Sequence, residues 1–267
     1  PEYIELMNIS PSDAIELTGV SFDAGITYGF PDGFTLAPEE RVVIPKSQTA
    51  FAATYPTAGI RIAPGEFVGS LSNEGETIAL LDQGGVDIRR FRYNDKHPWP
   101  ESPDGLGYAL ALIAPLTNPD HSVPSNWRAS VLPGGSPGGS DSMPLVGDPN
   151  ADADGDGRAA LLEHAVGQSD ADPADGGVLT FGTTTVDGEL GNGPEDFFTV
   201  SFRRNLAADD VAYLVVVSTD LVTWSPAEAE LVASVNNGDG TTTETYRTTI
   251  PYDARVRQFM RLEVTQR

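Results

Sequence analysis

Acidic side chains alternate with small residues in one short stretch of the chain, "DPNADADGDGRAALLEHAVG", at residues 148–167. Five carboxylates fall between Asp148 and Glu163. Calcium is a hard cation that takes about six to eight oxygen ligands, and alternate residues of a tight loop can point carboxylate oxygens inward. The stretch therefore allows two interpretations, a solvated acidic linker and a loop that binds a cation.

The stretch fits the calcium-loop template D-x-[DN]-x-[DN]-G-x5-E in one frame only. The ligands expected in that frame are Asp152, Asp154 and Asp156 at positions 1, 3 and 5, the backbone carbonyl of Arg158 at position 7, and Glu163 at position 12. Gly157 stands at position 6, where the sharp turn favours a residue without a Cβ atom. Ala160, at position 9, has no ligating side chain, so we expect a water molecule there.

The local charge of the segment predicts different conformations for the acidic linker and for the cation-binding loop. Residues 141–175 contain nine acidic residues and one arginine, a local charge of 1 − 9 = −8. Without a counterion, that repulsion would keep the segment extended, whereas a cation would remove the repulsion and order the helix after the loop. An apolar stripe after the loop, ended by Gly167, predicts this exiting helix. We therefore predict a structural calcium site on a loop–helix unit similar to dockerin-type, EF-hand-like loops.

The other candidate motifs do not meet the structural requirements of catalysis. "GGSPG" around Ser136 matches an esterase motif, but the motif needs a preceding strand and a following helix, and here it lies in a Gly/Pro-rich stretch. Glu74 and Glu76 fit a turn between strands better than an acid–base pair. The histidines His97, His121 and His164 have no second histidine at ligand spacing. The sequence therefore predicts no catalytic constellation, and we expect the chain not to be an enzyme.

Aromatic residues suggest a weaker alternative site. Trp99 stands between prolines in "NDKHPWP", and Tyr93 precedes it. Exposed aromatic rings in a loop can stack on sugars, whereas buried ones would only pack the edge of a sheet. The pair is a candidate for ligand binding, and packing is the competing interpretation.

The elements that must carry these residues are mainly β-strands. Short runs bounded by Gly, Pro, Asn or Asp fill residues 1–132, and a similar pattern returns over 177–267, where "NNGDG" at 236–240 predicts a hairpin turn. One helix-like piece, "KSQTAFAATYP", interrupts the first region. We expect two antiparallel β-sandwich domains of immunoglobulin-like type over those ranges, a Gly/Pro linker at 133–147 and the calcium element at 148–176.

Composition limits the partners. The net charge of −23, from 16 basic and 39 acidic residues, would repel a phosphate backbone, so we expect no nucleic-acid binding. The absence of cysteine excludes disulfides and thiolate metal sites. No apolar run approaches the ~18 residues that a membrane span needs, so we expect no membrane insertion.

The first region has a recognisable pattern. "EYIELMN", "IELTGVSF", "FPDGFTLAPEERVVI", "GSLSNEGETIALLD", "FRYNDKHPWP", "DGLGYALALI" and "NWRAS" occur in this order over residues 2–130. As a set they resemble the bacterial lamin-tail domain family, which has an immunoglobulin-like fold. The insertion in "MNISPSDAIEL" departs from the short turn of many members. The whole chain is similar to C-terminal regions of large bacterial surface or secreted proteins, some with a spore-coat-H kinase-like domain upstream; no kinase part lies in this chain.

These observations predict a non-catalytic accessory or interaction region of a larger bacterial extracellular or cell-surface protein, with structural Ca²⁺. The expected partners are other domains of the parent protein, proteins or glycans. The alternative is a carbohydrate-binding module region of a secreted polysaccharide-acting enzyme.

Overall fold

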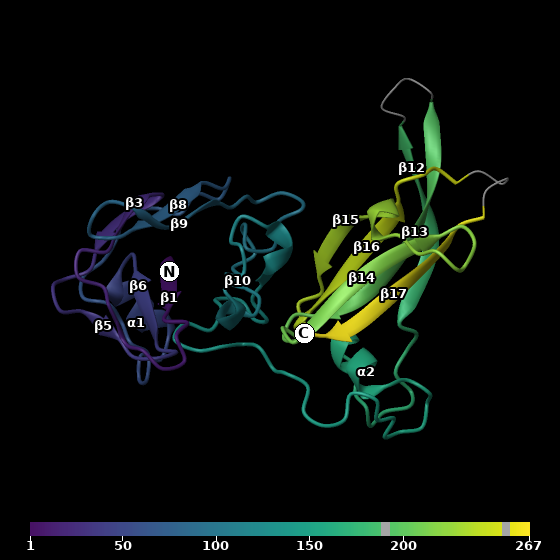
Figure 1. Ribbon diagram of the computed structural model, residues 1–267, viewed down its shortest axis with the longest axis horizontal. Coiled ribbons are helices and arrows are strands. Elements are labelled where there is room, and N and C mark those ends of the chain that lie inside the picture. Colours follow the sequence, from purple (N-terminus) through teal and green to yellow (C-terminus); the bar gives the residue numbers. More distant parts are fainter. Residues whose placement is uncertain (188–192, 253–256) are drawn as a thin grey trace. The chain divides into compact units, whose positions relative to one another are not determined.

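The computed structural model describes residues 1–187, 193–252 and 257–267. These contain seventeen strands and only two short α-helices, and every strand pairing within the sheets is antiparallel. The predicted mainly-β, antiparallel class is therefore confirmed (Figure 1). The chain forms two compact units, Pro1–Asp141 and Ser142–Arg267, which divide inside the stretch that the sequence predicts as a linker.

The first unit is built from short strands. Its elements are β1 (Tyr3–Met7), β2 (Ile15–Glu16), β3 (Ser21–Ala24), β4 (Ile26–Gly29), β5 (Thr35–Leu36), β6 (Arg41–Pro45), α1 (Gln48–Thr54), β7 (Val68–Gly69), β8 (Thr77–Leu81), β9 (Asp87–Arg92), β10 (Leu110–Leu112), β11 (Trp127–Ala129) and the 3-10 turns η1 (Pro115–Thr117) and η2 (Pro124–Asn126). A five-stranded sheet has the order β7-β4-β3-β8-β9. Three two-stranded sheets, β1-β6, β2-β5 and β10-β11, complete the unit.

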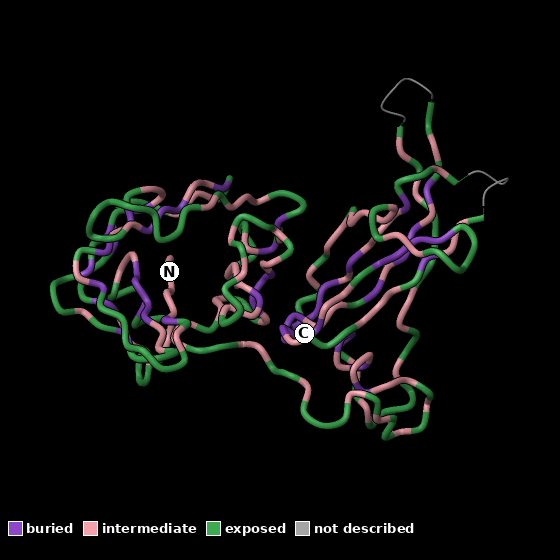
Figure 2. Tube along the Cα trace, in the orientation of Figure 1, coloured by how far each residue is buried: buried purple, intermediate pink, exposed green. Residues whose placement is uncertain are grey.

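The core of this unit follows from its apolar runs. Val42 and Ile44 of β6 are fully buried and pack with apolar residues of β3, β4 and β8. Figure 2 colours the chain by the burial of each residue. The expected helix forms as α1, where Ser47 accepts a hydrogen bond from the N–H of Ala50 and so caps the first turn. Phe51 of α1 is fully buried, which fixes the helix against the unit.

Gly75 lies in the turn before β8, at a position where no side chain fits. A Cβ atom there would lie 2.4 Å from the carbonyl oxygen of Tyr93 and 2.6 Å from Cα of Asn94, and φ is +80°. Gly33 has a similar φ of +74° but open space around it. We expect Gly75→Ala to lower the free energy of unfolding by about 1–3 kcal/mol more than Gly33→Ala does, because only Gly75→Ala adds overpacking to backbone strain. Urea unfolding of both variants measures the difference, and equal losses would contradict the close approach.

Residues 133–141, the first part of the Gly/Pro-rich stretch, are not a free linker. The carbonyl oxygen of Gly134 accepts hydrogen bonds from the hydroxyls of Tyr3 and Tyr55, at 3.0 and 2.7 Å. The N–H of Gly138 donates to Glu5, at 2.6 Å. Asp141 forms a buried ion pair with Arg128, at 2.6 Å. Composition alone predicts a linker here, but these long-range hydrogen bonds fold residues 133–141 onto the first unit.

The second unit has longer strands. Its elements are α2 (Ala160–Val166), β12 (Leu179–Asp187), β13 (Pro194–Asn205), β14 (Val211–Ser218), η3 (Pro226–Glu228), β15 (Ala229–Asn236), β16 (Thr241–Thr248) and β17 (Phe259–Gln266). A four-stranded sheet has the order β12-β13-β16-β15, and β14 pairs with β17. The predicted hairpin at 236–240 joins β15 to β16. Side chains of β13, β14 and β17 form a common core, so the two sheets of this unit pack through Val200, Phe202, Val215, Val217 and Met260.

Candidate cation site

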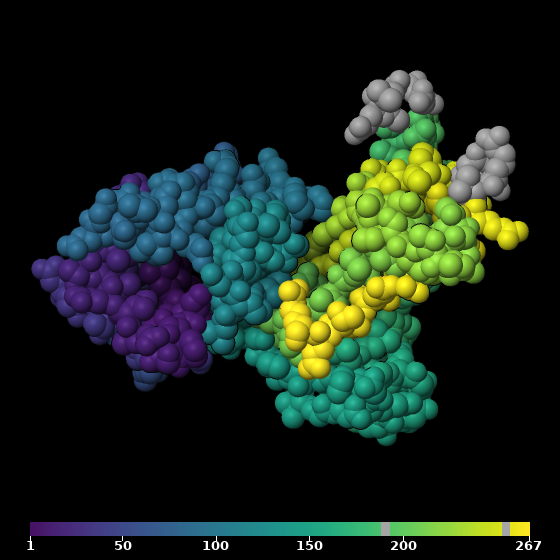
Figure 3. All heavy atoms as spheres, in the orientation of Figure 1, coloured from purple at the N-terminus to yellow at the C-terminus, as the bar shows by residue number. Residues whose placement is uncertain are grey.

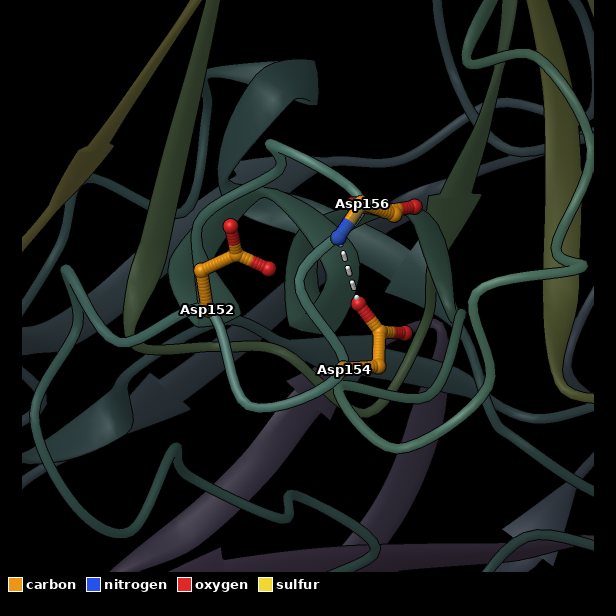
Figure 4. Close-up of side chains that lie close together, drawn as sticks. All are labelled: Asp152, Asp154 and Asp156. Carbon is orange, nitrogen blue, oxygen red and sulfur yellow. Dashed lines mark hydrogen bonds between the residues drawn. The ribbon is translucent and has the colours of Figure 1, made fainter.

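The three predicted aspartates come together in the second unit. One carboxylate oxygen from each of Asp152, Asp154 and Asp156 lies within 4.8 Å of the other two (Figure 4). The loop curls because Gly155 and Gly157 adopt positive φ angles of 81° and 90°. The carboxylate of Asp152 accepts hydrogen bonds from both glycine N–H groups, at 2.9 and 3.1 Å, and so holds the turn closed.

Glu163 is the most unusual member of the predicted set. It lies in the first turn of α2 and is fully buried. Neither of its carboxylate oxygens has a hydrogen-bond partner among the described residues, and the same holds for the buried Oδ2 of Asp154. Burial, and then the charges of Asp154 and Asp156, raise the pKa of Glu163 to about 7. Three buried acceptor atoms without a donor are costly, because each has lost its water and gained no partner.

Arg158, whose backbone carbonyl is a predicted ligand, also makes contacts through its side chain. Its guanidinium forms an ion pair with Asp156, and this hydrogen bond holds the pKa of that carboxyl below its usual range. The same guanidinium donates to the carbonyl oxygens of Asp175 and Gly176, at 2.9 and 2.7 Å. The side chain therefore ties the loop to residues beyond the helix, a contact that the template does not predict.

The helix α2 forms as the apolar stripe predicts. Gly167 ends it in the left-handed conformation, and its N–H donates to the carbonyls of Glu163 and His164. A seven-residue helix has little stability of its own, so tertiary contacts must hold it.

Those contacts come from the second unit. Tyr213 of β14 donates its hydroxyl hydrogen to the carbonyl oxygen of Ala165, at 2.7 Å, and Asn205 of β13 donates to that of His164, at 2.9 Å. The His164 ring also pairs with Asp210, at 3.1 Å. The loop and helix are thus continuous with the strands of this unit (Figure 3). The sequence predicts a separate element between two domains, whereas the element is a part of the second unit.

Asp170 is a neighbour of the loop that the sequence reasoning missed. Its Oδ1 accepts a hydrogen bond from the N–H of Ala153, between the first two predicted ligands, at 2.9 Å. The template ends at Glu163 and gives no reason to look seven residues further. The only sequence signal is that acidic residues continue through "QSDADPAD".

This donor set fits calcium. The groups that the structure brings to the loop are carboxylates, and the buried oxygens of Glu163 and Asp154 have no hydrogen-bond partner among the described residues. No histidine or thiol belongs to it, which disfavours zinc.

Trp99 and Tyr93 are arranged for packing. Trp99 is only 8% exposed, and its ring lies 6.1 Å from that of Trp127. The Tyr93 hydroxyl donates to the carbonyl oxygen of Ser72, at 2.8 Å, and its ring packs against the core of the first unit. Of the two interpretations, the burial of Trp99 fits packing, because a buried ring is not exposed for stacking on a sugar.

The candidate catalytic residues do not assemble into one constellation. Ser136 lies in a turn without a following helix, and Glu76 accepts hydrogen bonds from the Ser72 N–H and the Tyr93 hydroxyl. His121 stacks edge-on against Trp127, and burial lowers its pKa. These contacts are typical of structural residues.

No protein family, curated protein or solved structure matches the chain. The resemblance to the lamin-tail family stays a prediction from the sequence. Among the residues described, no helix has the length and apolarity to cross a membrane.

Proposed function

We propose that the chain is a non-catalytic accessory and interaction region of a larger bacterial extracellular or cell-surface protein, and that a structural calcium ion stabilises its second unit. The observation that carries the calcium site is the group of three buried, unpartnered oxygens on Glu163 and Asp154. Asp154 meets Asp152 and Asp156 in the loop, and the charges of Asp154 and Asp156 act on Glu163. A divalent cation held by these side chains and the Arg158 carbonyl would compensate the buried charge.

The proposed location sets the expected affinity. Calcium loops of extracellular modules bind with Kd on the order of 10⁻⁴–10⁻³ M, which suits surroundings with abundant calcium. The ion's role is structural, because the loop continues into a helix that Tyr213 and Asn205 hold on the strands. Binding would thus stabilise the packing of this unit.

The proposed interaction role rests on the two β units and on the resemblance of residues 2–130 to lamin-tail domains. The strongly acidic surface favours partners other than polyanions. The partners proposed are other domains of the parent protein, proteins or glycans.

Isothermal titration of the EDTA-treated and dialysed chain with CaCl₂ tests the site. We expect one binding event with Kd on the order of 10⁻⁴–10⁻³ M. Glu163→Gln should weaken it at least about tenfold, because it removes a charged bidentate ligand. Glu228→Gln, an equal change of charge outside the loop, is the control and should bind like the unaltered chain.

Two results would contradict the proposal. If the Glu163→Gln variant binds calcium as tightly as the unaltered chain, the proposed calcium site is wrong. If a screen of esterase, nuclease and glycosidase substrates finds robust turnover, the proposed non-catalytic role is wrong.

A further inference from the structure

Residues 168–176, here called the return segment, fold back from the end of α2 onto the acidic loop. Three hydrogen bonds from loop residues fix it there: Ala153 N–H to Asp170, and the Arg158 guanidinium to the carbonyls of Asp175 and Gly176. At its start, the N–H of Gln168 donates to the carbonyl oxygen of Glu163, at 2.8 Å. The return segment is therefore one side of the same site, although it lies outside the twelve-residue loop.

Asp170 is the residue of this segment that points its charge at the site. Its Oδ1 is 2.9 Å from the nitrogen of Ala153, which lies between Asp152 and Asp154. Its carboxyl also lies beside that of Glu163 and contributes to the raised pKa of Glu163. Two carboxylates in contact repel each other, and neither Glu163 oxygen receives a hydrogen bond from the described residues. A bound cation would turn this repulsion into shared coordination.

The loop itself lacks one side-chain ligand. Position 9 of the template is Ala160, which is buried and has no oxygen in its side chain. In calcium loops this position commonly supplies its oxygen through a water molecule. Asp170 brings a carboxylate to the loop from the segment after α2, so it can replace that water.

We propose that Asp170 is a direct ligand of the cation, and that its carboxylate supplies the oxygen that Ala160 cannot. This inference rests on the proposed calcium site and deepens it. The ion then binds five carboxylates, those of Asp152, Asp154, Asp156, Glu163 and Asp170. It joins three consecutive parts of the chain: the loop, the first turn of α2, and the return segment that leads into β12.

The variant Asp170→Asn tests this role with little disturbance of the fold. The asparagine side chain keeps an oxygen that can accept the Ala153 N–H, so it removes mainly the charge. Asp172→Asn is the matched control, because Asp172 belongs to the same segment, is exposed, and its side chain accepts a hydrogen bond from the N–H of Ala174. We expect Asp170→Asn to weaken calcium binding about tenfold and Asp172→Asn to leave it nearly unchanged.

A second measurement separates direct coordination from charge effects at a distance. Eu³⁺ is a probe for calcium sites, and its luminescence lifetimes in H₂O and D₂O report how many waters it coordinates. We expect one additional water on Eu³⁺ bound to an Asp170→Ala variant, whose side chain has no oxygen to coordinate the ion, and no change for Asp172→Ala.

The outcomes distinguish this inference from the calcium site itself. If Asp170→Ala leaves the water count unchanged, Asp170 is not a ligand, even if the affinity falls. If Asp170→Asn and Asp172→Asn bind calcium alike while Glu163→Gln still loses binding, the role of Asp170 is wrong and the calcium site stands. If Glu163→Gln also binds normally, the site itself is wrong.

Discussion

Removing calcium should lower the melting temperature of the second unit by about 10 °C and leave the first unit unchanged. A ligand at 100 times its Kd adds about 2.7 kcal/mol to the free energy of unfolding. For a unit of this size, residues 142–267, each kcal/mol corresponds to about 3–5 °C. The effect reaches the whole unit because α2 is hydrogen-bonded to β13 and β14. Calorimetry with excess calcium or EDTA measures the shift, and hydrogen exchange assigns each transition to a unit.

The variant Glu163→Gln is a control, because its effect on the melting temperature should differ in sign with and without calcium. With calcium, the variant should melt below the unaltered chain, since a ligand is lost. In EDTA it should melt at the same temperature or higher, because it removes a buried charge that Asp154 and Asp156 repel. A variant that melts lower by the same amount in both conditions would mean that Glu163 acts only in packing.

Glu244→Ala should lower the free energy of unfolding of the second unit by about 3–5 kcal/mol, because it leaves the buried charge of Arg204 without its carboxylate. Nη1 of Arg204 lies 2.9 Å from Oε1 of Glu244, and the two side chains are 19% and 5% exposed. The guanidinium also lies over the ring of Tyr213, the residue that holds α2. Urea unfolding followed by circular dichroism measures the loss.

Glu230→Ala is the matched control for that loss. Glu230 pairs with Arg247 between β15 and β16 of the same sheet, but its side chain is 42% exposed. Water and salt screen such a pair, so we expect a loss below about 1 kcal/mol. Equal losses for the two alanine variants would show that burial of the Arg204–Glu244 pair has no energetic consequence.

Local patterns in the sequence predict much of this structure. Alternating apolar and polar residues between turn formers predict the β class, and "NNGDG" predicts the hairpin that joins β15 to β16. The spacing of acidic residues predicts which three aspartates meet, and the apolar stripe predicts α2. In each case the signal lies within about a dozen neighbouring residues, which is the range over which periodicity and turn chemistry act.

Contacts between distant residues leave no such signal. The hydrogen bond from the Tyr3 hydroxyl to the Gly134 carbonyl joins residues that are 131 positions apart. Local composition carries no trace of such a contact and therefore predicts a free linker. Burial of Trp99 depends on Trp127, and the approach of Asp170 depends on how the chain turns after Gly167. The attachment of the acidic loop and α2 to the second unit likewise depends on Tyr213 and Asn205, which lie about forty or more residues further along the chain.

The attachment of α2 to later strands also bears on the order in which the parts of this unit fold during synthesis. The loop and α2 leave the ribosome before β13 and β14, the strands that supply Asn205 and Tyr213. A helix of seven residues does not persist in isolation, and the charge of the emerging segment keeps it extended. We therefore expect the acidic segment to stay unfolded until the later strands are made. We also expect the proposed calcium ion to bind late in the folding of this unit, once the strands that hold α2 have formed.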